Sequence, residues 1–200
     1  MQHNSFGDLQ CPIARSLERV GECWNILILR EAFLGAQRFD EFHKKLGIAP
    51  NMLSRRLRAM VAHGLLEKRP YSTRPVRHEY LLTQAGRDFR PVLWALMAWG
   101  NRYFAPEGPA VHVVNSATGV PADPLLIDRA SGQPLAFPAF RVVAGPAADS
   151  HTLAVHPVWP ATTPAPAPVP GTEPQIQPAD TDAHPRVPAL EGCPHDQPDL

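Results

Sequence analysis

The chain has 200 residues and no net formal charge, but its two halves differ sharply in composition. Residues 1–105 hold 16 of the 19 basic residues and 9 of the 19 acidic ones, which gives this half a charge of +7. Residues 106–200 hold 19 of the 24 prolines and carry a charge of −7. The first half therefore predicts a basic domain with a polyanionic partner such as nucleic acid, although a solvated basic surface explains the charge equally well.

Cysteine content and hydropathy argue against a disulfide-stabilised protein and against a membrane-spanning one. The three cysteines, Cys11, Cys23 and Cys193, cannot build a disulfide framework, which favours a reduced, cytoplasmic setting. No apolar stretch approaches the ~20 residues that span a bilayer, and the start of the sequence has no apolar run of the signal-peptide type. We therefore expect no membrane partner.

The elements expected in the first half begin with helices. Residues 1–10 show no periodicity and predict a flexible arm. Helices are predicted over residues 12–20, 24–34, 38–46 and 51–63, each followed by a glycine. The second is apolar on most sides, as is typical of a buried core helix. The third and fourth are amphipathic and joined by a short turn containing glycine, which is the signature of a helix-turn-helix.

A hairpin and a long helix are expected next. Residues 65–69 and 76–82 predict two strands, and the turn-rich basic segment 70–75 between them predicts a β-hairpin with a long tip, a wing. Thr83 is placed to cap a helix that starts at Gln84 and reaches Phe104, and Pro91 should kink or divide this helix. Its apolar stripe is broad for the end of a small domain, which predicts burial against a second copy of the chain.

The helix at 51–63 is the expected DNA-reading element. At about 100° per residue its leucines and Met60 fall on one side, and its polar side chains fall on the other. The polar face consists of Asn51, Ser54, Arg55 and Arg58. Arginine can bind guanine and asparagine can bind adenine through paired hydrogen bonds in the major groove. Arg56 points between the two faces, where it can reach a phosphate or a neighbouring carboxylate.

The hairpin supplies further candidates. Arg74 and Arg77 are expected to contact the phosphate backbone or the minor groove beside the recognition helix. The alternative for a basic loop is simple solvation. The order helix, helix, turn, polar helix and basic hairpin within one short run favours DNA contact.

Several ordered motifs carry a family resemblance. They are C-P at Cys11, W-x-x-x-I-L, R-F-x-x-F, L-S-R-R-L-R-A-M, G-L-L-E-K-R-P-Y, V-R-H-E-Y-x-L-T-x-x-G and Trp99-Gly100. With them, residues 11–104 resemble the HxlR-type winged helix-turn-helix transcriptional regulators. The resemblance implies a homodimer that binds an inverted-repeat operator and represses or activates transcription. Ala49 departs from the serine cap common in the family, which should weaken the helix start by about 1 kcal/mol, and Pro50 partly offsets this loss.

The resemblance also implies roles for the dimer helices and for one cysteine. The interface is expected to form through the N-terminal helix and the last long helix. Its candidate residues are Ile13, Leu17, Leu93, Trp94, Met97 and Trp99. Cys11 corresponds to the near-N-terminal cysteine that senses oxidants in some members. The alternative for Cys11 is a small buried hydrophobic residue, and Cys23 is expected to serve packing only.

The second half is expected to be simpler. Residues 106–150 alternate short β-like pieces with turns and predict a small β-rich extension. It resembles a zinc-ribbon-like hairpin pair found in some family members, but the ligand positions hold Asn115, Ser116, Asp128 and Ser131, so we expect no metal and no cofactor. Residues 151–200 are rich in proline and alanine and acidic, which predicts a disordered tail.

The sequence thus predicts a mainly α (α+β) fold, a winged helix-turn-helix, and a homodimeric, sequence-specific regulator that binds double-stranded DNA. An enzyme is disfavoured because the sequence has no phosphate-binding glycine loop, nucleophile elbow or metal-ligand spacing. A winged-helix module that binds proteins and not DNA is the alternative. In that case the outward face of residues 51–62 would be apolar or acidic.

Overall fold

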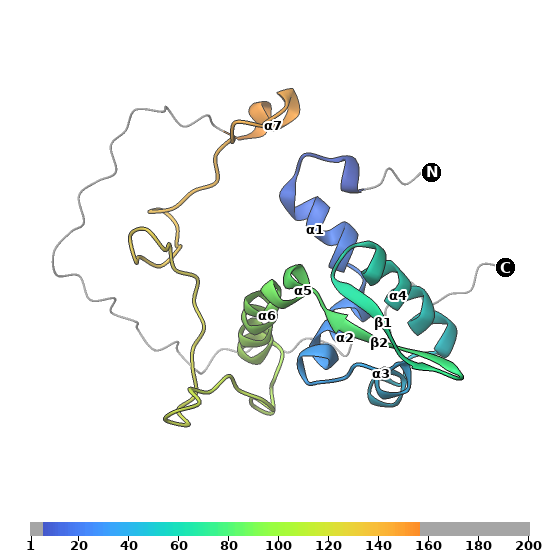
Figure 1. The fold of residues 1–200 in the computed structure, drawn as a ribbon. Helices are drawn as coiled ribbons and strands as arrows, with labels where there is room; N and C mark the ends of the chain where they lie inside the picture. The colour runs from blue at the N-terminus through green and yellow to red at the C-terminus, as the bar shows by residue number, and fades with distance from the viewer. Residues whose placement is uncertain (1–5, 157–200) are drawn as a thin grey trace. The chain divides into compact units, whose positions relative to one another are not determined.

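The computed structural model describes residues 6–156. The start of the predicted arm and the predicted tail beyond residue 156 lie outside the described residues. The described chain divides into two units, residues 6–96 and residues 97–156, and each is presented by itself (Figure 1).

The first unit consists of helices and one antiparallel hairpin. Its helices are α1 (Pro12–Val20), α2 (Cys23–Phe33), α3 (Phe39–Leu46), α4 (Pro50–Ala62), α5 (Gln84–Asp88) and the first part of α6 (Arg90–Tyr103). The hairpin pairs β1 (Leu66–Thr73) with β2 (Val76–Leu82). A short 3-10 helix η1 (Phe6–Asp8) lies within the predicted arm, and the Phe6 amide donates a hydrogen bond to Glu18 on α1 (3.1 Å). The helices and the two strands follow the predicted order.

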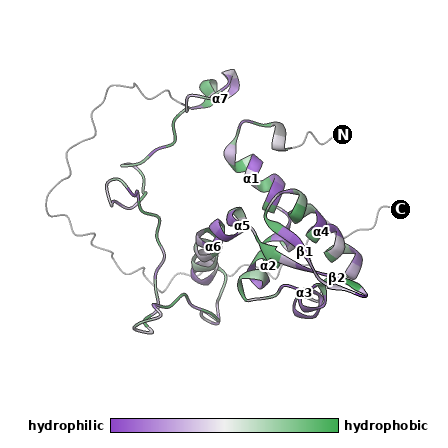
Figure 2. Cartoon of the chain, viewed as in Figure 1, coloured by the Kyte–Doolittle hydropathy of each residue, from purple (hydrophilic) through white to green (hydrophobic). Residues whose placement is uncertain are grey.

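The core of this unit forms where α2, α3, α4 and the base of the hairpin meet. Its largest fully buried side chains are Ile28, Leu29, Phe42, Ile48, Leu53, Leu57, Met60 and Leu66. The prediction that α2 is a core helix is confirmed, because Ile28 and Leu29 have no exposed surface. α4 carries hydrophilic residues beside hydrophobic ones (Figure 2), as its predicted two faces require.

The hairpin differs from the prediction in the length of its first strand. β1 continues to Thr73, which pairs with Val76, so the tip is only the two residues Arg74 and Pro75. The prediction of a long loop over 70–75 was wrong. Pro70 has no N–H to donate, but a two-stranded sheet has only edge strands, and the register shift between Pro70 and Ser72 accommodates the proline.

The connection from the hairpin to α6 follows the prediction closely. The Thr83 hydroxyl accepts a hydrogen bond from the Gly86 amide (3.1 Å) and so caps α5. The same hydroxyl donates to the Gly64 carbonyl (2.6 Å). α5 ends at Asp88 and α6 begins at Arg90, so the proline at position 91 divides the predicted helix in its first turn, where proline is tolerated.

The second unit contains the rest of α6, the extension and α7 (Ser150–Val155). Between α6 and α7 the described chain forms no strand. The predicted β-like pieces pair only at the isolated bridges Val114–Pro121 and Ile127–Pro134. α7 lies at the start of the predicted tail, and the Asp149 carboxylate accepts a hydrogen bond from the Thr152 amide (2.8 Å) to cap it.

Two turns of the extension share one sequence pattern and one hydrogen-bonding scheme. The Asn115 side chain accepts from the amides of Ala117 (2.9 Å) and Thr118 (3.3 Å). The Asp128 carboxylate accepts from the Ser131 amide and hydroxyl (2.8 and 2.6 Å), which lowers the pKa of Asp128. The residue that corresponds to Ser131 in the first turn is therefore Thr118, which lies two positions after Ser116.

Gly86 marks a close approach between α5 and the base of the hairpin. A Cβ at this position would overlap the carbonyl oxygen of Leu65, whereas a Cβ at Gly100 in α6 would meet nothing within 4 Å. We expect Gly86→Ala to lower the free energy of unfolding by roughly 1–3 kcal/mol, because the backbone at Leu65 must shift. Gly100→Ala is the matched control and should be neutral or raise stability by up to ~1 kcal/mol. Urea unfolding of both variants tests this, and equal midpoints would contradict it.

Candidate nucleic-acid interface

The start of α4 has no side-chain cap and depends on a backbone hydrogen bond and on a proline in the first turn. Ala49 occupies the N-cap position without a side-chain hydrogen bond, and Pro50 opens the helix. The Leu53 amide donates to the Ala49 carbonyl (2.9 Å), which closes the first turn. Ala49 therefore leaves the helix without the serine cap that is common in the family, as expected from the sequence. The amides of the first turn that no cap satisfies are donors that suit a phosphate oxygen.

The outward face of α4 brings together four of the predicted residues. Asn51, Arg55 and Arg58 are exposed, and Ser54 is half-buried beside them. Arg55 reaches the Met52 sulfur (3.2 Å) and Arg58 the Ser54 carbonyl (3.3 Å), which are local contacts on the same helix. Among the described residues, no carboxylate forms an ion pair with either arginine. Both guanidinium groups therefore keep most of their donors for a ligand.

Arg56 is placed differently from its neighbours. Its side chain is only 13% exposed, and its Nη2 lies 2.7 Å from the Glu22 carboxylate. Its Nε is buried without a hydrogen-bond partner in the described part of the chain. Of the two alternatives left open by the sequence, the structure shows the carboxylate contact. Arg56 ties α4 to the start of α2 and does not belong to the exposed face.

The hairpin presents its arginines in two ways. Arg69 pairs with Glu79 across the strands (2.7 Å), which neutralises part of the charge at its base. Arg74 at the tip and Arg77 at the start of β2 are exposed. Within the described residues neither has an ion-pair partner, so their positive charge is left unpaired near the tip of the hairpin.

An isolated β-bridge that no sequence pattern indicated lies beside the hairpin. The Tyr80 amide donates to the Gln37 carbonyl (2.7 Å), and Arg38 forms a bridge with Glu79. The Arg38 guanidinium also lies 4.5 Å from the centre of the Tyr71 ring. These contacts attach β2 and the bulge of β1 to the entry of α3 and so orient the hairpin against the helix-turn-helix.

Glu41 holds this entry segment in place. Its carboxylate accepts hydrogen bonds from the amides of Gln37 (2.8 Å) and Arg38 (3.0 Å), and these bonds lower the pKa of Glu41. Glutamate at the third helical position is one half of a capping box. Here Arg38 occupies the N-cap position, where serine or threonine is usual, so the motif could not be recognised from the sequence. On β2, burial raises the pKa of Tyr80, and the nearby positive charge of Arg58 acts against this rise.

The predicted dimer residues have different environments. Ile13 and Leu17 on α1 and Trp94 and Trp99 on α6 are exposed. Met97 is half-buried, and Leu93 is half-buried against the core of the first unit. Leu93 therefore has a place in the monomer core, while the two tryptophans leave large apolar surfaces uncovered.

The two cysteines in the described residues also differ. Cys11 is exposed and occupies the N-cap position of α1, and Cys23 is half-buried at the first residue of α2. The interpretation of Cys11 as a buried hydrophobic residue is therefore wrong. Packing remains the prediction for Cys23.

A helix-turn-helix with a basic hairpin beside its second helix defines the winged helix-turn-helix class of transcription regulators. The family model described as HxlR-like helix-turn-helix matches residues 19–108. The HTH-type transcriptional regulator Rv3095 of Mycobacterium tuberculosis is 48% identical over 122 residues, which cover 60% of this chain and 77% of that protein. The chain belongs to the HxlR-like helix-turn-helix family.

Two solved structures are similar over a longer segment. The candidate transcription factor PA1374 of Pseudomonas aeruginosa is 52% identical with a TM-score of 0.54, and the match covers 71% of this chain and 97% of that one. PA1607, another candidate transcription factor, is 40% identical with a TM-score of 0.64 and is covered completely, again over 71% of this chain. A match of this length reaches beyond residue 108, so the similarity takes in part of the extension.

The similar proteins and the fold are those of transcription regulators and not of enzymes. In the part of the chain that the structure describes, no helix is long and apolar enough to cross a membrane. In the same residues, no three His, Cys, Asp or Glu side chains gather as a metal site would require.

Proposed function

We propose that the protein is a sequence-specific transcription regulator that binds its operator in double-stranded DNA as a homodimer. α4 enters the major groove, and the tip of the hairpin contacts the phosphate backbone or the minor groove. One observation carries the proposal: Asn51, Arg55 and Arg58 share an exposed face of α4, and the arginines on it have no ion pair within the described residues. A module that binds only proteins would expose an apolar or acidic face here, and this face is polar and basic.

The homodimer follows from the uncovered apolar side chains of α1 and α6. Two copies related by a two-fold axis present two recognition helices, which fit half-sites about 34 Å apart in an inverted repeat. Whether such a dimer represses or activates depends on where its operator lies relative to the promoter.

Substitution of Arg55 tests the assignment of sequence readout to α4. With the DNA upstream of the gene as probe, we expect Arg55→Ala to lower the preference for operator over unrelated DNA by about 1–3 kcal/mol, because a bidentate contact to one base is lost. Arg74→Ala should weaken binding to both DNAs and reduce the salt dependence by about one phosphate contact.

Arg56→Ala and Arg129→Ala are the comparisons for this gel-shift series. Arg56→Ala should lower the thermal midpoint and change DNA preference little, because its partner is Glu22. Arg129 is exposed in the extension, and its variant should behave as the unchanged protein. Absence of any shift at low salt with the unchanged protein would remove the proposal.

Charge placed on the exposed face of α6 tests the homodimer. Trp94→Glu should convert dimers to monomers in light scattering after size-exclusion chromatography, because a charge at a desolvated interface is costly. Leu34→Glu is the control, since Leu34 is 67% exposed at the end of α2 and lies outside the proposed interface. Monomers of the unchanged protein at micromolar concentration, or intact dimers of Trp94→Glu, would contradict this interface.

Regulation through Cys11 is a separate proposal, which its exposure favours. Oxidation of a thiol at the N-cap of α1 adds polar atoms beside Ile13 on the same helix and so disturbs the proposed dimer face. We expect a mild oxidant to change operator affinity in the gel shift and expect Cys11→Ser to abolish this change. A full response in Cys11→Ser would assign the effect elsewhere.

A further inference from the structure

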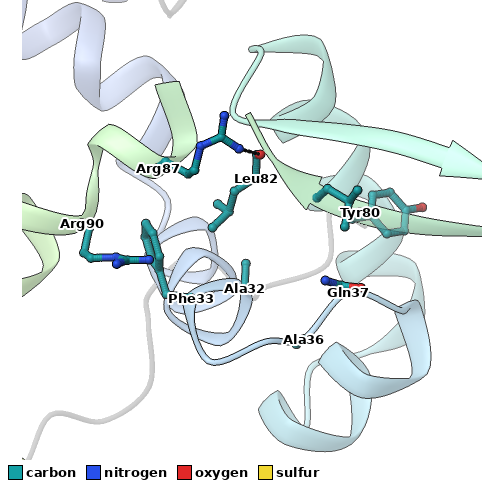
Figure 3. A pocket seen from close by; sticks show the side chains of 9 residues that line it. Ala32, Phe33, Ala36, Gln37, Tyr80, Leu82, Arg87 and Arg90 are labelled. Carbon is teal, nitrogen blue, oxygen red and sulfur yellow. Dashed lines mark hydrogen bonds between the residues drawn. The ribbon is translucent and has the colours of Figure 1, made fainter. Parts of the chain in front are cut away.

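A hollow of about 260 Å³ lies in the first unit where the end of α2, β2 and the α5–α6 junction meet (Figure 3). Two arginines, Arg87 and Arg90, line it together with Phe33, Tyr80, Gln37 and small or aliphatic residues of α2, of the segment after α2 and of β2. No aspartate or glutamate is among its lining residues. The hollow therefore concentrates positive charge beside an apolar wall without a carboxylate to balance it.

Arg90 is the more available of the two arginines. Its guanidinium lies 4.7 Å from the centre of the Phe33 ring, and Figure 3 shows the two side chains side by side. In the described part of the chain it forms no hydrogen bond to another side chain and no ion pair. The aromatic contact favours a position of the guanidinium over the ring and leaves its N–H groups for a ligand.

Arg87 is fixed by hydrogen bonds at the same hollow. Its Nη1 donates to the Leu82 carbonyl (2.6 Å), and its Nε and Nη2 donate to the Gln84 side chain (3.3 and 3.1 Å). Each terminal nitrogen carries two N–H groups, so one on each remains. Arg87 adds a fixed positive charge and two further donors.

We propose that this hollow binds a small planar organic carboxylate. A guanidinium pairs with a carboxylate through two parallel charge-assisted hydrogen bonds, a geometry that Arg90 can offer. Ala32, Ala36 and Leu82 form an apolar surface for the body of the ligand. The volume lies just below the range of roughly 300–1,000 Å³ for common ligand clefts, which limits the ligand to about one ring.

A ligand at this location would connect the hairpin with α6. Arg87 belongs to α5 and Arg90 to the first turn of α6, so a carboxylate held by both bridges the break between these helices. β2 forms another wall of the hollow. A bound acid would therefore stiffen the joint between the hairpin and α6. Its effect on DNA binding rests on the proposed function, whereas binding itself does not.

Titration of the full chain with benzoate, followed by calorimetry, tests the site. We expect saturable binding of one benzoate per chain and at least tenfold weaker binding of neutral benzamide. Arg90→Gln should weaken benzoate binding at least tenfold, and Arg90→Lys should recover only part of this loss, because lysine keeps the charge without the planar fork. Arg129→Gln is the control and should bind as the unchanged protein does.

Three outcomes would overturn the proposal, provided that thermal unfolding shows Arg90→Gln to be folded. The first is no saturable binding up to ~1 mM benzoate, which is the weak end of specific association. The second is that Arg90→Gln binds benzoate as tightly as the unchanged protein. The third is that inorganic phosphate competes for the site as well as a second carboxylate would. Weaker non-specific DNA binding by Arg90→Gln without any benzoate binding would assign the arginines to phosphate contacts and overturn it as well. Loss of DNA binding with intact benzoate binding would instead contradict the proposed function alone.

Discussion

The burial of one face of α4 is the constraint on which the rest of the site depends. Leu53, Leu57 and Met60 have no exposed surface, and each such side chain contributes about 1.5–3 kcal/mol by leaving water. A helix advances about 100° per residue, so fixing these three positions fixes the direction of every other side chain on α4. Arg55 and Arg58 therefore point outward because the leucines point inward. The core therefore determines which residues face outward on the helix that is proposed to read DNA.

The three arginines of α4 show how neighbours in sequence take different roles. Arg55 and Arg58 make only local contacts and remain exposed. Arg56 lies between the two faces, where its charge is mostly buried and the Glu22 carboxylate compensates it. A buried charge without its partner is costly, so this pair constrains how α4 sits on α2. A count of basic residues in α4 would therefore overstate the positive charge that its exposed face offers to a ligand.

The sequence predicted the features that depend on local chemistry. Helix periods, the Thr83 cap and the break at Pro91 each follow from residues close together in the chain, and all are present. The sequence did not predict the pairing of Gln37 with Tyr80, because that contact joins residues 43 positions apart and has no local signal. Pro70 led to the opposite error, because it predicted a loop where the structure has a strand. Proline breaks a central strand, but the bulged edge of a two-stranded sheet tolerates it.

One joint connects the two ends of the proposed mechanism. The Thr83 hydroxyl bonds both to Gly64, where the chain leaves α4, and to Gly86, inside α5. The Leu65 carbonyl accepts from the Thr83 amide (3.1 Å) and packs against Gly86 with no room for a side chain. The exit of the recognition helix, the base of the hairpin and the start of the α5–α6 segment thus share one set of short contacts. Packed contacts of this kind do not deform gradually, so a change in the direction of α6 on the proposed dimerisation would also shift the base of the hairpin. An acid held between Arg87 and Arg90, as proposed, would stiffen the same joint. The apolar face that orients Arg55 and the joint that holds α5 therefore belong to one packed connection between the proposed dimer contact and the proposed DNA contact.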